Sequence, residues 1–131
     1  MKGKLALFLL LVSCVAYSKT TVVNVYYFHT NFRCPTCTKM EAYTREAIDT
    51  NFKKEIASGL INFKTVNMEE KKNEHFIKDY QLYTKTVILS KTEDGKQIKY
   101  KNLDKIWEYS RNKNKFLNYV KDEVSKYLIT N

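Results

Sequence analysis

The chain has 131 residues, a length typical of one compact domain with a single hydrophobic core, and its formal net charge is +9. It contains only one proline and three glycines, and no linker rich in serine, glycine or proline, no low-complexity tract and no internal repeat is present. We therefore expect a single domain, and neither a repeat protein nor a low-complexity chain.

The first residues have the pattern of a secretory signal. Two lysines precede an apolar stretch at residues 5–12, and small residues follow it. Cleavage after Ser18 would divide the chain into a signal peptide, 1–18, and a working domain, 19–131. Cleavage before Cys14 is the alternative, because the Leu-Val-Ser-Cys sequence ending there resembles a bacterial lipoprotein box. Cys14 would then carry a lipid instead of being discarded.

Export therefore defines the expected location, which is the periplasm or a lipid anchor on the cell envelope. No other stretch approaches the roughly 20 apolar residues of a membrane span, so we expect membrane contact only through that anchor. The basic charge is explained by a solvated lysine-rich face, although an acidic partner or anionic headgroups would also use it. Export counts against nucleic acid as a partner.

A run of β-branched and aromatic residues at 22–29 predicts a strand buried on both faces of a sheet. The sequence Arg-Cys-Pro-Thr-Cys at 33–37 follows it. If a helix begins at Cys34, this sulfur lies beside unpaired backbone N–H groups and Cys37 lies one turn further along the helix. That arrangement suits thiol–disulfide exchange, in which one thiol attacks and the other resolves.

The neighbours of Cys34 favour its thiolate form. Arg33 supplies a positive charge, and a helix N-terminus lowers the pKa of a cysteine well below about 8.5. Pro35 suits the first helical turn because its missing N–H would be unpaired there in any case. Thr36 is the remaining residue that helps to set the redox balance of the pair. We therefore predict that Cys34 is the nucleophile.

The remaining elements alternate between strands and helices. Asparagines at positions 112 and 114 mark a break in the C-terminal helical pattern. Glu-Asp-Gly-Lys at 93–96 predicts a tight turn between two antiparallel strands. In chain order, we expect a helix at 35–57 ended by Gly59, a strand at 60–66, a loop at 67–70, a short helix at 74–80, strands at 86–90 and 97–101, and a broken helix or two helices from 103 to 128.

This order, with Cys-x-x-Cys after the first strand, resembles the thioredoxin fold. The resemblance covers residues 26–39, 63–70 and 80–96. It implies an α/β fold with a central mixed sheet of about four strands flanked by helices. It also implies that Cys34 is the nucleophilic and Cys37 the resolving cysteine of a redox-active disulfide.

Two positions depart from the thioredoxin pattern. Lys85, flanked by Thr84 and Thr86, stands where the family has a cis-proline that helps to dock the substrate. A cis bond before a non-proline residue costs about 2.5–4 kcal/mol, so we expect a trans bond and a reshaped substrate groove. Lys85 either stabilises the Cys34 thiolate and attracts an anionic substrate or is one of many solvent-facing lysines.

Phe28 is the second departure, because it occupies the position of the buried acid that relays protons to the resolving cysteine. A different group, or water, must then deprotonate Cys37. His29 is a candidate because histidine titrates near neutral pH. Its alternative role is that of an ordinary residue at a strand end.

Within the thioredoxin-like proteins, the Cys-Pro-Thr-Cys motif, the missing cis-proline and residues 80–90 are most similar to a small bacterial family. Its members are ArsF-like subunits of nitrophenyl-compound nitroreductases, found near arsenic-resistance functions. This resemblance implies electron delivery to a partner protein. No glycine-rich phosphate loop for a flavin or a nicotinamide is present, so we expect no bound cofactor.

The preferred function is an exported thiol–disulfide oxidoreductase that exchanges disulfides with a protein partner, such as a membrane electron carrier. A zinc site is one alternative, because Cys-x-x-Cys supplies half of a tetrahedral ligand set, but only His29 and His75 remain as ordinary soft ligands. A redox-silent module is the other. Its disulfide would be structural, and tyrosines such as Tyr83, Tyr100 and Tyr109 would bind a partner.

Overall fold

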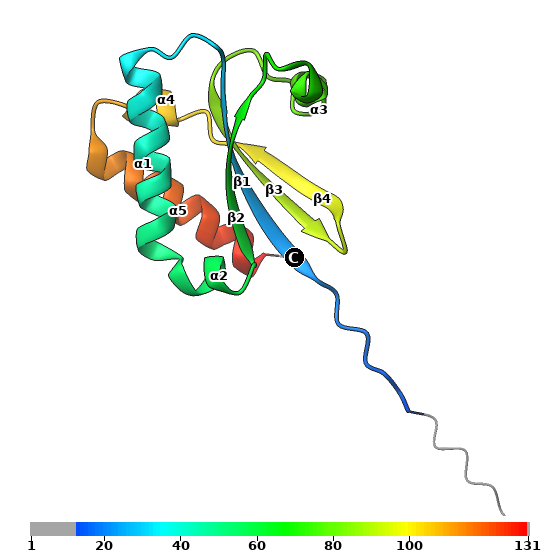
Figure 1. Ribbon diagram of the computed structural model, residues 1–131. Coiled ribbons are helices and arrows are strands. Elements are labelled where there is room, and N and C mark those ends of the chain that lie inside the picture. Colours follow the sequence, from blue (N-terminus) through cyan, green and yellow to red (C-terminus); the bar gives the residue numbers. More distant parts are fainter. Residues whose placement is uncertain (1–12, 131) are drawn as a thin grey trace, which may run out of the picture.

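Four strands form one mixed sheet in the computed structural model, which describes residues 13–130 (Figure 1). The central strand β1 (Thr21–His29) runs parallel to β2 (Ile61–Asn67) and antiparallel to β3 (Thr86–Glu93). An antiparallel edge strand, β4 (Lys96–Asn102), follows β3 and completes the order β2-β1-β3-β4. The predicted α/β architecture is confirmed, and it agrees with a thioredoxin-like fold.

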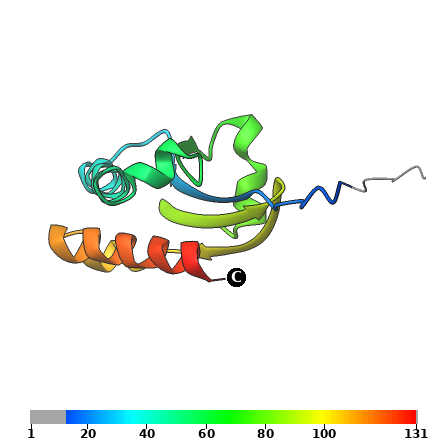
Figure 2. The ribbon, with the colours of Figure 1, turned by 90° about the horizontal axis from the view of Figure 1, so that it is seen from below.

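Helices cover both faces of this sheet. The long helices α1 (Pro35–Asn51) and α5 (Lys113–Ile129) pack side by side on one face, as Figure 2 shows from below. The short α3 (His75–Asp79) lies on the opposite face, after a 3-10 turn at Lys71–Asn73. A further short helix, α4 (Ile106–Tyr109), leads into α5.

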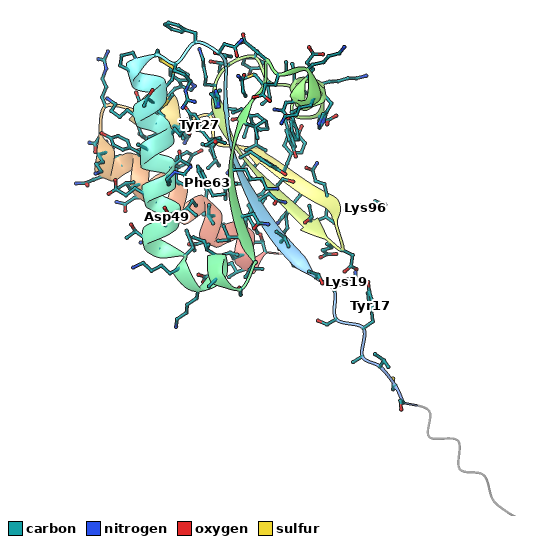
Figure 3. The ribbon with its side chains drawn as sticks, viewed as in Figure 1. Tyr17, Lys19, Tyr27, Asp49, Phe63 and Lys96 are labelled. Carbon is teal, nitrogen blue, oxygen red and sulfur yellow. A yellow bond between two sulfur atoms is a disulfide. The ribbon has the colours of Figure 1, made fainter. Side chains whose placement is uncertain are left out.

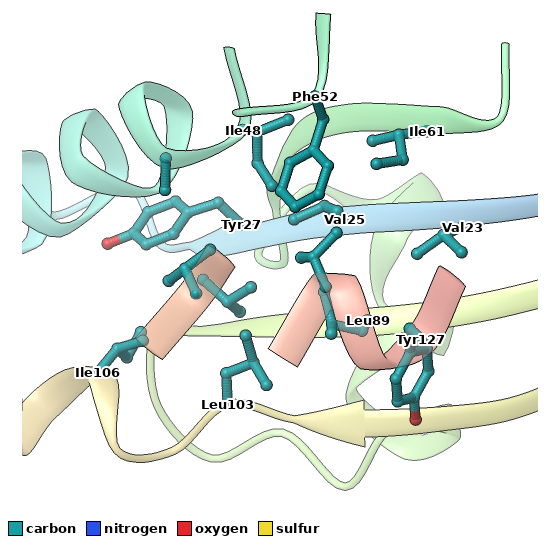
Figure 4. Close-up of a cluster of buried hydrophobic side chains, with 14 of the residues drawn as sticks. Val23, Val25, Tyr27, Ile48, Phe52, Ile61, Leu89, Leu103, Ile106 and Tyr127 are labelled. Atoms are coloured by element: carbon teal, nitrogen blue, oxygen red, sulfur yellow. The ribbon is translucent and has the colours of Figure 1, made fainter. Parts of the chain in front are cut away.

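Side-chain alternation along β1 explains why both faces of the sheet need cover. Val23, Val25 and Tyr27 point into the larger core between the sheet, α1 and α5 (Figure 4). Phe28 points the other way, into a smaller cluster with Tyr80. All four β1 side chains are fully buried, so the continuous apolar run has the double burial that its composition predicts.

The helix predicted at residues 35–57 is interrupted at Phe52, and the last part is a separate helix, α2 (Lys53–Ala57). Phe52 leaves the helical conformation, with φ −129° and ψ 36°, and its ring joins the larger core at 5% exposure. Burial of this ring accompanies the departure from one regular helix. Gly59 follows α2 with a φ of +79°, a conformation that suits a residue without a Cβ.

The C-terminal break lies at Asn112 and not at Asn114. The Asn112 side chain caps α5 by accepting a hydrogen bond from the Lys115 N–H at 3.1 Å. Asn114 lies inside the first turn of α5, so that part of the prediction was wrong. The predicted hairpin turn is confirmed, with Asp94 and Gly95 at φ values of 51° and 79°, as a two-residue turn of type I′ requires.

The predicted signal peptide lies mostly outside the described residues, which begin at Ser13. Residues 13–20 contain no helix or strand, and Cys14 is exposed and not disulfide-bonded. Between residues 13 and 130, no helix combines the length and the apolar character that a membrane span needs.

Candidate functional site

The two cysteines of the motif form a disulfide at the start of α1, where a yellow bond marks it in Figure 3. Cys34 is the N-cap residue of α1, with an extended backbone, and Pro35 occupies the first helical position. Cys37 follows within the first turn, and the two Cα atoms are 5.0 Å apart. The local sequence therefore places both sulfurs at the positive end of a long helix.

The two sulfurs differ in their access to solvent. Cys37 is only 1% exposed, whereas Cys34 is partly exposed. The backbone N–H of Cys37 points at the Cys34 sulfur, with a nitrogen–sulfur distance of 3.0 Å. After reduction, this N–H and the helix dipole favour negative charge on Cys34. An external thiol or disulfide can approach Cys34 directly, while Cys37 is positioned to attack from inside.

Tyr27 contacts the buried cysteine from the central strand, and Figure 3 shows it between α1 and the sheet. Its hydroxyl donates a hydrogen bond to the Cys37 carbonyl at 2.6 Å. Burial raises the pKa of Tyr27 to about 12, against an opposing effect of the Arg33 charge. The phenol is therefore a neutral donor at physiological pH.

Sequence reasoning missed Tyr27 because it compared Phe28 with the family's buried acid. The signal was present in the alternation of β1, since Tyr27 shares its face with Val23 and Val25, which lie opposite α1. Phe28 is on the other face, in the cluster with Tyr80.

Arg33 forms an ion pair with Glu41, two turns into α1. The sequence analysis did not identify Glu41 as a partner of Arg33. Its carboxylate compensates part of the Arg33 charge. Because α1 has no acidic residue in its first turn, no carboxylate there opposes negative charge on Cys34. The balance between Arg33 and Glu41 therefore contributes to the field at the exposed sulfur.

Lys85 precedes β3, and the described residues contain no cis peptide bond. Its ammonium lies 5.7 Å from the centre of the Phe32 ring, in the loop that leads to Cys34. Its carbonyl accepts a hydrogen bond from the indole N–H of Trp107 at 2.8 Å. The structure thus brings Lys85 beside this loop and joins it to α4. Thr84 is exposed.

His29 ends β1 and is partly buried. Its Nδ1 lies 3.0 Å from the Thr30 carbonyl oxygen. Because a carbonyl can only accept a hydrogen bond, Nδ1 carries the proton in this arrangement. Among the hydrogen bonds of the described residues, none joins the His29 ring to Cys34 or Cys37.

An open pocket of about 610 Å³ adjoins the partly exposed Cys34. The first part of α1 forms one wall of the pocket. The other wall is formed by α4 and the residues that follow it, and Figure 1 draws α4 behind α1. The sequence did not predict this pocket because its two walls are far apart in the chain. It is lined by Cys34, Thr36, Lys39, Trp107, Glu108, Ser110 and Arg111.

Within residues 13–130, no group of three or more histidines, cysteines, aspartates or glutamates has the geometry to hold a metal ion. Neither the protein-family models nor the curated proteins compared with this chain match it. The functional argument therefore depends on the geometry of the cysteine pair and its surroundings.

Proposed function

We propose that the protein is a thiol–disulfide oxidoreductase in which Cys34 and Cys37 exchange disulfides, or pass electrons, with a partner protein. The observation that carries this proposal is the unequal burial of the pair at the start of α1: Cys34 is partly exposed and lines a pocket, whereas Cys37 is enclosed. A purely structural disulfide across so short a loop contributes comparatively little stability in the chain-entropy model.

The reaction follows from this asymmetry. In the reducing direction, the Cys34 thiolate attacks a disulfide of the partner, forms a mixed disulfide and releases one partner sulfur as a thiolate. The Cys37 thiolate then attacks the Cys34 sulfur and releases the second partner thiolate. Two electrons pass from the protein dithiol to the partner disulfide, and the Cys34–Cys37 disulfide is restored. The oxidising direction is the reverse of these steps.

We propose the location and partner from the sequence. The N-terminal pattern supports export to the periplasm or the cell envelope, with Cys14 as the lipid attachment point if cleavage occurs before it. A membrane electron carrier would then keep the pair reduced. The resemblance to ArsF-like nitroreductase subunits adds a finer proposal, in which the electrons serve an arsenic-resistance or nitroreductase system.

Redox titration against glutathione tests the proposed activity. We expect the Cys34–Cys37 pair to equilibrate at a potential between about −270 and −120 mV, the range of related dithiols.

A Cys37→Ser variant should accumulate mixed disulfides with its partners, and the Cys34→Ser variant is the matched control that should not. A pair that resists reduction, together with no difference between the two variants, would instead identify a redox-silent module.

A further inference from the structure

The pocket beside Cys34 has an unequal charge distribution. Lys39 and Arg111 contribute two positive charges to its walls, and Glu108 contributes one negative charge. Among the described residues, neither Lys39 nor Arg111 forms an ion pair, in contrast to Arg33, which is paired with Glu41. The two cations are therefore available to a ligand.

Trp107 adds an apolar surface to the same pocket. Its indole N–H is already used by the Lys85 carbonyl, and the side chain is 38% exposed. The ring is therefore anchored at one edge and offers its remaining surface to a ligand. A site of about 610 Å³ has the size of a pocket for a small molecule or a few residues of a peptide.

We propose that this pocket selects disulfide substrates in which a carboxylate lies next to the reacting cysteine, as in an acidic peptide segment. Cys34 exchanges with the substrate sulfur, Lys39 and Arg111 bind the carboxylate, and Trp107 contacts the adjoining apolar atoms. Glu108 opposes this selection because its charge repels the carboxylate. The inference rests on the proposed function, since it specifies the substrate class of the same cysteine pair.

Charge attraction of this kind acts on the encounter and on the orientation of the substrate. An exposed pair of opposite charges contributes only modestly to the free energy of binding. The two cations should therefore change the rate at which a carboxylate-bearing disulfide reacts with Cys34 by about threefold to tenfold. The effect should weaken as salt increases, because the Debye length falls to about 10 Å at 0.1 M ionic strength. A contribution from shape or apolar contact would not show this salt dependence.

The experiment measures how fast three disulfide-bonded peptides oxidise the reduced protein at low salt. The peptides are identical except for glutamate, glutamine or lysine beside the cysteine. We expect the glutamate peptide to react fastest and the lysine peptide slowest. The ratio of the glutamate rate to the glutamine rate is the decisive quantity, because it cancels changes in the intrinsic reactivity of Cys34.

Variants assign this ratio to the pocket. The double variant Lys39→Gln with Arg111→Gln should bring the ratio close to one, whereas Glu108→Gln should increase it. The matched control changes two exposed lysines of α2, Lys53→Gln with Lys54→Gln, which lie beyond the other end of α1, and it should retain the wild-type ratio. Equal loss in both double variants would show that net charge, and not the pocket, selects the substrate.

The outcomes separate the two proposals. If no peptide oxidises the protein, the proposed thiol–disulfide activity fails. If the glutamine peptide reacts but the glutamate peptide has no advantage, the activity stands and the acidic selectivity is overturned. Free glutathione disulfide, tested in parallel, distinguishes a small carboxylate-bearing disulfide from a peptide segment: a larger dependence on Lys39 and Arg111 for glutathione than for the glutamate peptide would overturn the peptide assignment.

Discussion

The Tyr27 hydroxyl lies 2.6 Å from the Cys37 carbonyl oxygen, to which it donates a hydrogen bond, and both residues are buried. This bond joins the central strand of the sheet to the helical turn that holds the enclosed sulfur. The Tyr27 contact is therefore a tertiary constraint on the position of Cys37, in addition to the backbone bonds of α1.

Replacing Tyr27 by phenylalanine removes this bond and retains the ring. We expect Tyr27→Phe to lower the free energy of unfolding by about 0.5–1.5 kcal/mol, the usual net value of one hydrogen bond. Urea denaturation of the oxidised protein measures this change. Tyr83→Phe is the control, because Tyr83 is 92% exposed and its replacement should have little effect.

The alkaline stability should also depend on Tyr27. Burial raises its pKa in the folded protein to about 12, above the ordinary value of 10.0. The folded state therefore holds the phenolic proton more strongly than the unfolded state does. The resulting contribution of Tyr27 to the free energy of unfolding is complete below pH 10 and is lost as the pH rises toward 12. Unfolding curves at these pH values should show a smaller alkaline loss for Tyr27→Phe than for the wild type. Parallel losses would contradict the assigned role of the buried phenol.

Alkylation of the reduced protein should distinguish its three thiols. We expect iodoacetamide at neutral pH to modify Cys34 first, because it is accessible and faces the Cys37 N–H, and Cys37 last, because it is 1% exposed. Cys14 is an exposed internal reference in the full-length chain. Time-resolved mass spectrometry gives the order, and faster labelling of Cys37 than of Cys34 would reverse the assigned roles.

The Arg33–Glu41 ion pair should tune the reactivity of Cys34. Glu41→Gln leaves the Arg33 charge uncompensated, so the thiolate should be favoured and alkylation at neutral pH should accelerate, by up to about fivefold for an interaction of about 1 kcal/mol. Arg33→Gln should slow it. The Arg33→Gln, Glu41→Gln double variant is the control, and its rate should lie between those of the single variants.

Glu123 provides a test at acid pH, remote from the cysteines. Burial raises the pKa of this carboxyl group, but hydrogen bonds from Lys101 and Lys126 and their charges outweigh that effect, so its pKa is lowered from 4.5. Its stabilising contribution is therefore present above pH 4.5 and is lost as the pH falls below it. Glu123→Gln should lower the free energy of unfolding by about 1 kcal/mol at pH 7. The variant should also lose less stability than the wild type when the pH is lowered.

The control for Glu123 is Glu46→Gln, which removes the partner of Lys113 from an exposed ion pair. Such a pair contributes little, so this variant should be close to the wild type at both pH values. Thermal unfolding at pH 7 and pH 3.5 measures both variants. An effect of Glu46→Gln as large as that of Glu123→Gln would show that burial is not the cause.

Local patterns account for the parts of the fold that were predicted. The apolar run of β1, the Asp94-Gly95 turn and the Cys34-Pro35 start of α1 each depend on residues only a few positions apart. One error occurred where distant contacts accompany the local conformation: Phe52 interrupts the predicted helix, and its ring joins the larger core. The other error was local, because Asn112 caps α5 and Asn114 therefore lies inside that helix.

By itself, the sequence determined the position of the cysteine pair at a strand-to-helix junction and the order of elements that makes a mixed sheet. Spacing, capping and turn chemistry determine such features within a few residues. The tertiary structure alone decided that Tyr27 holds Cys37 and that Lys39 and Arg111 face one pocket beside Cys34. These relationships arise when α1, α4 and β1 pack together, because packing brings together side chains that no local pattern connects.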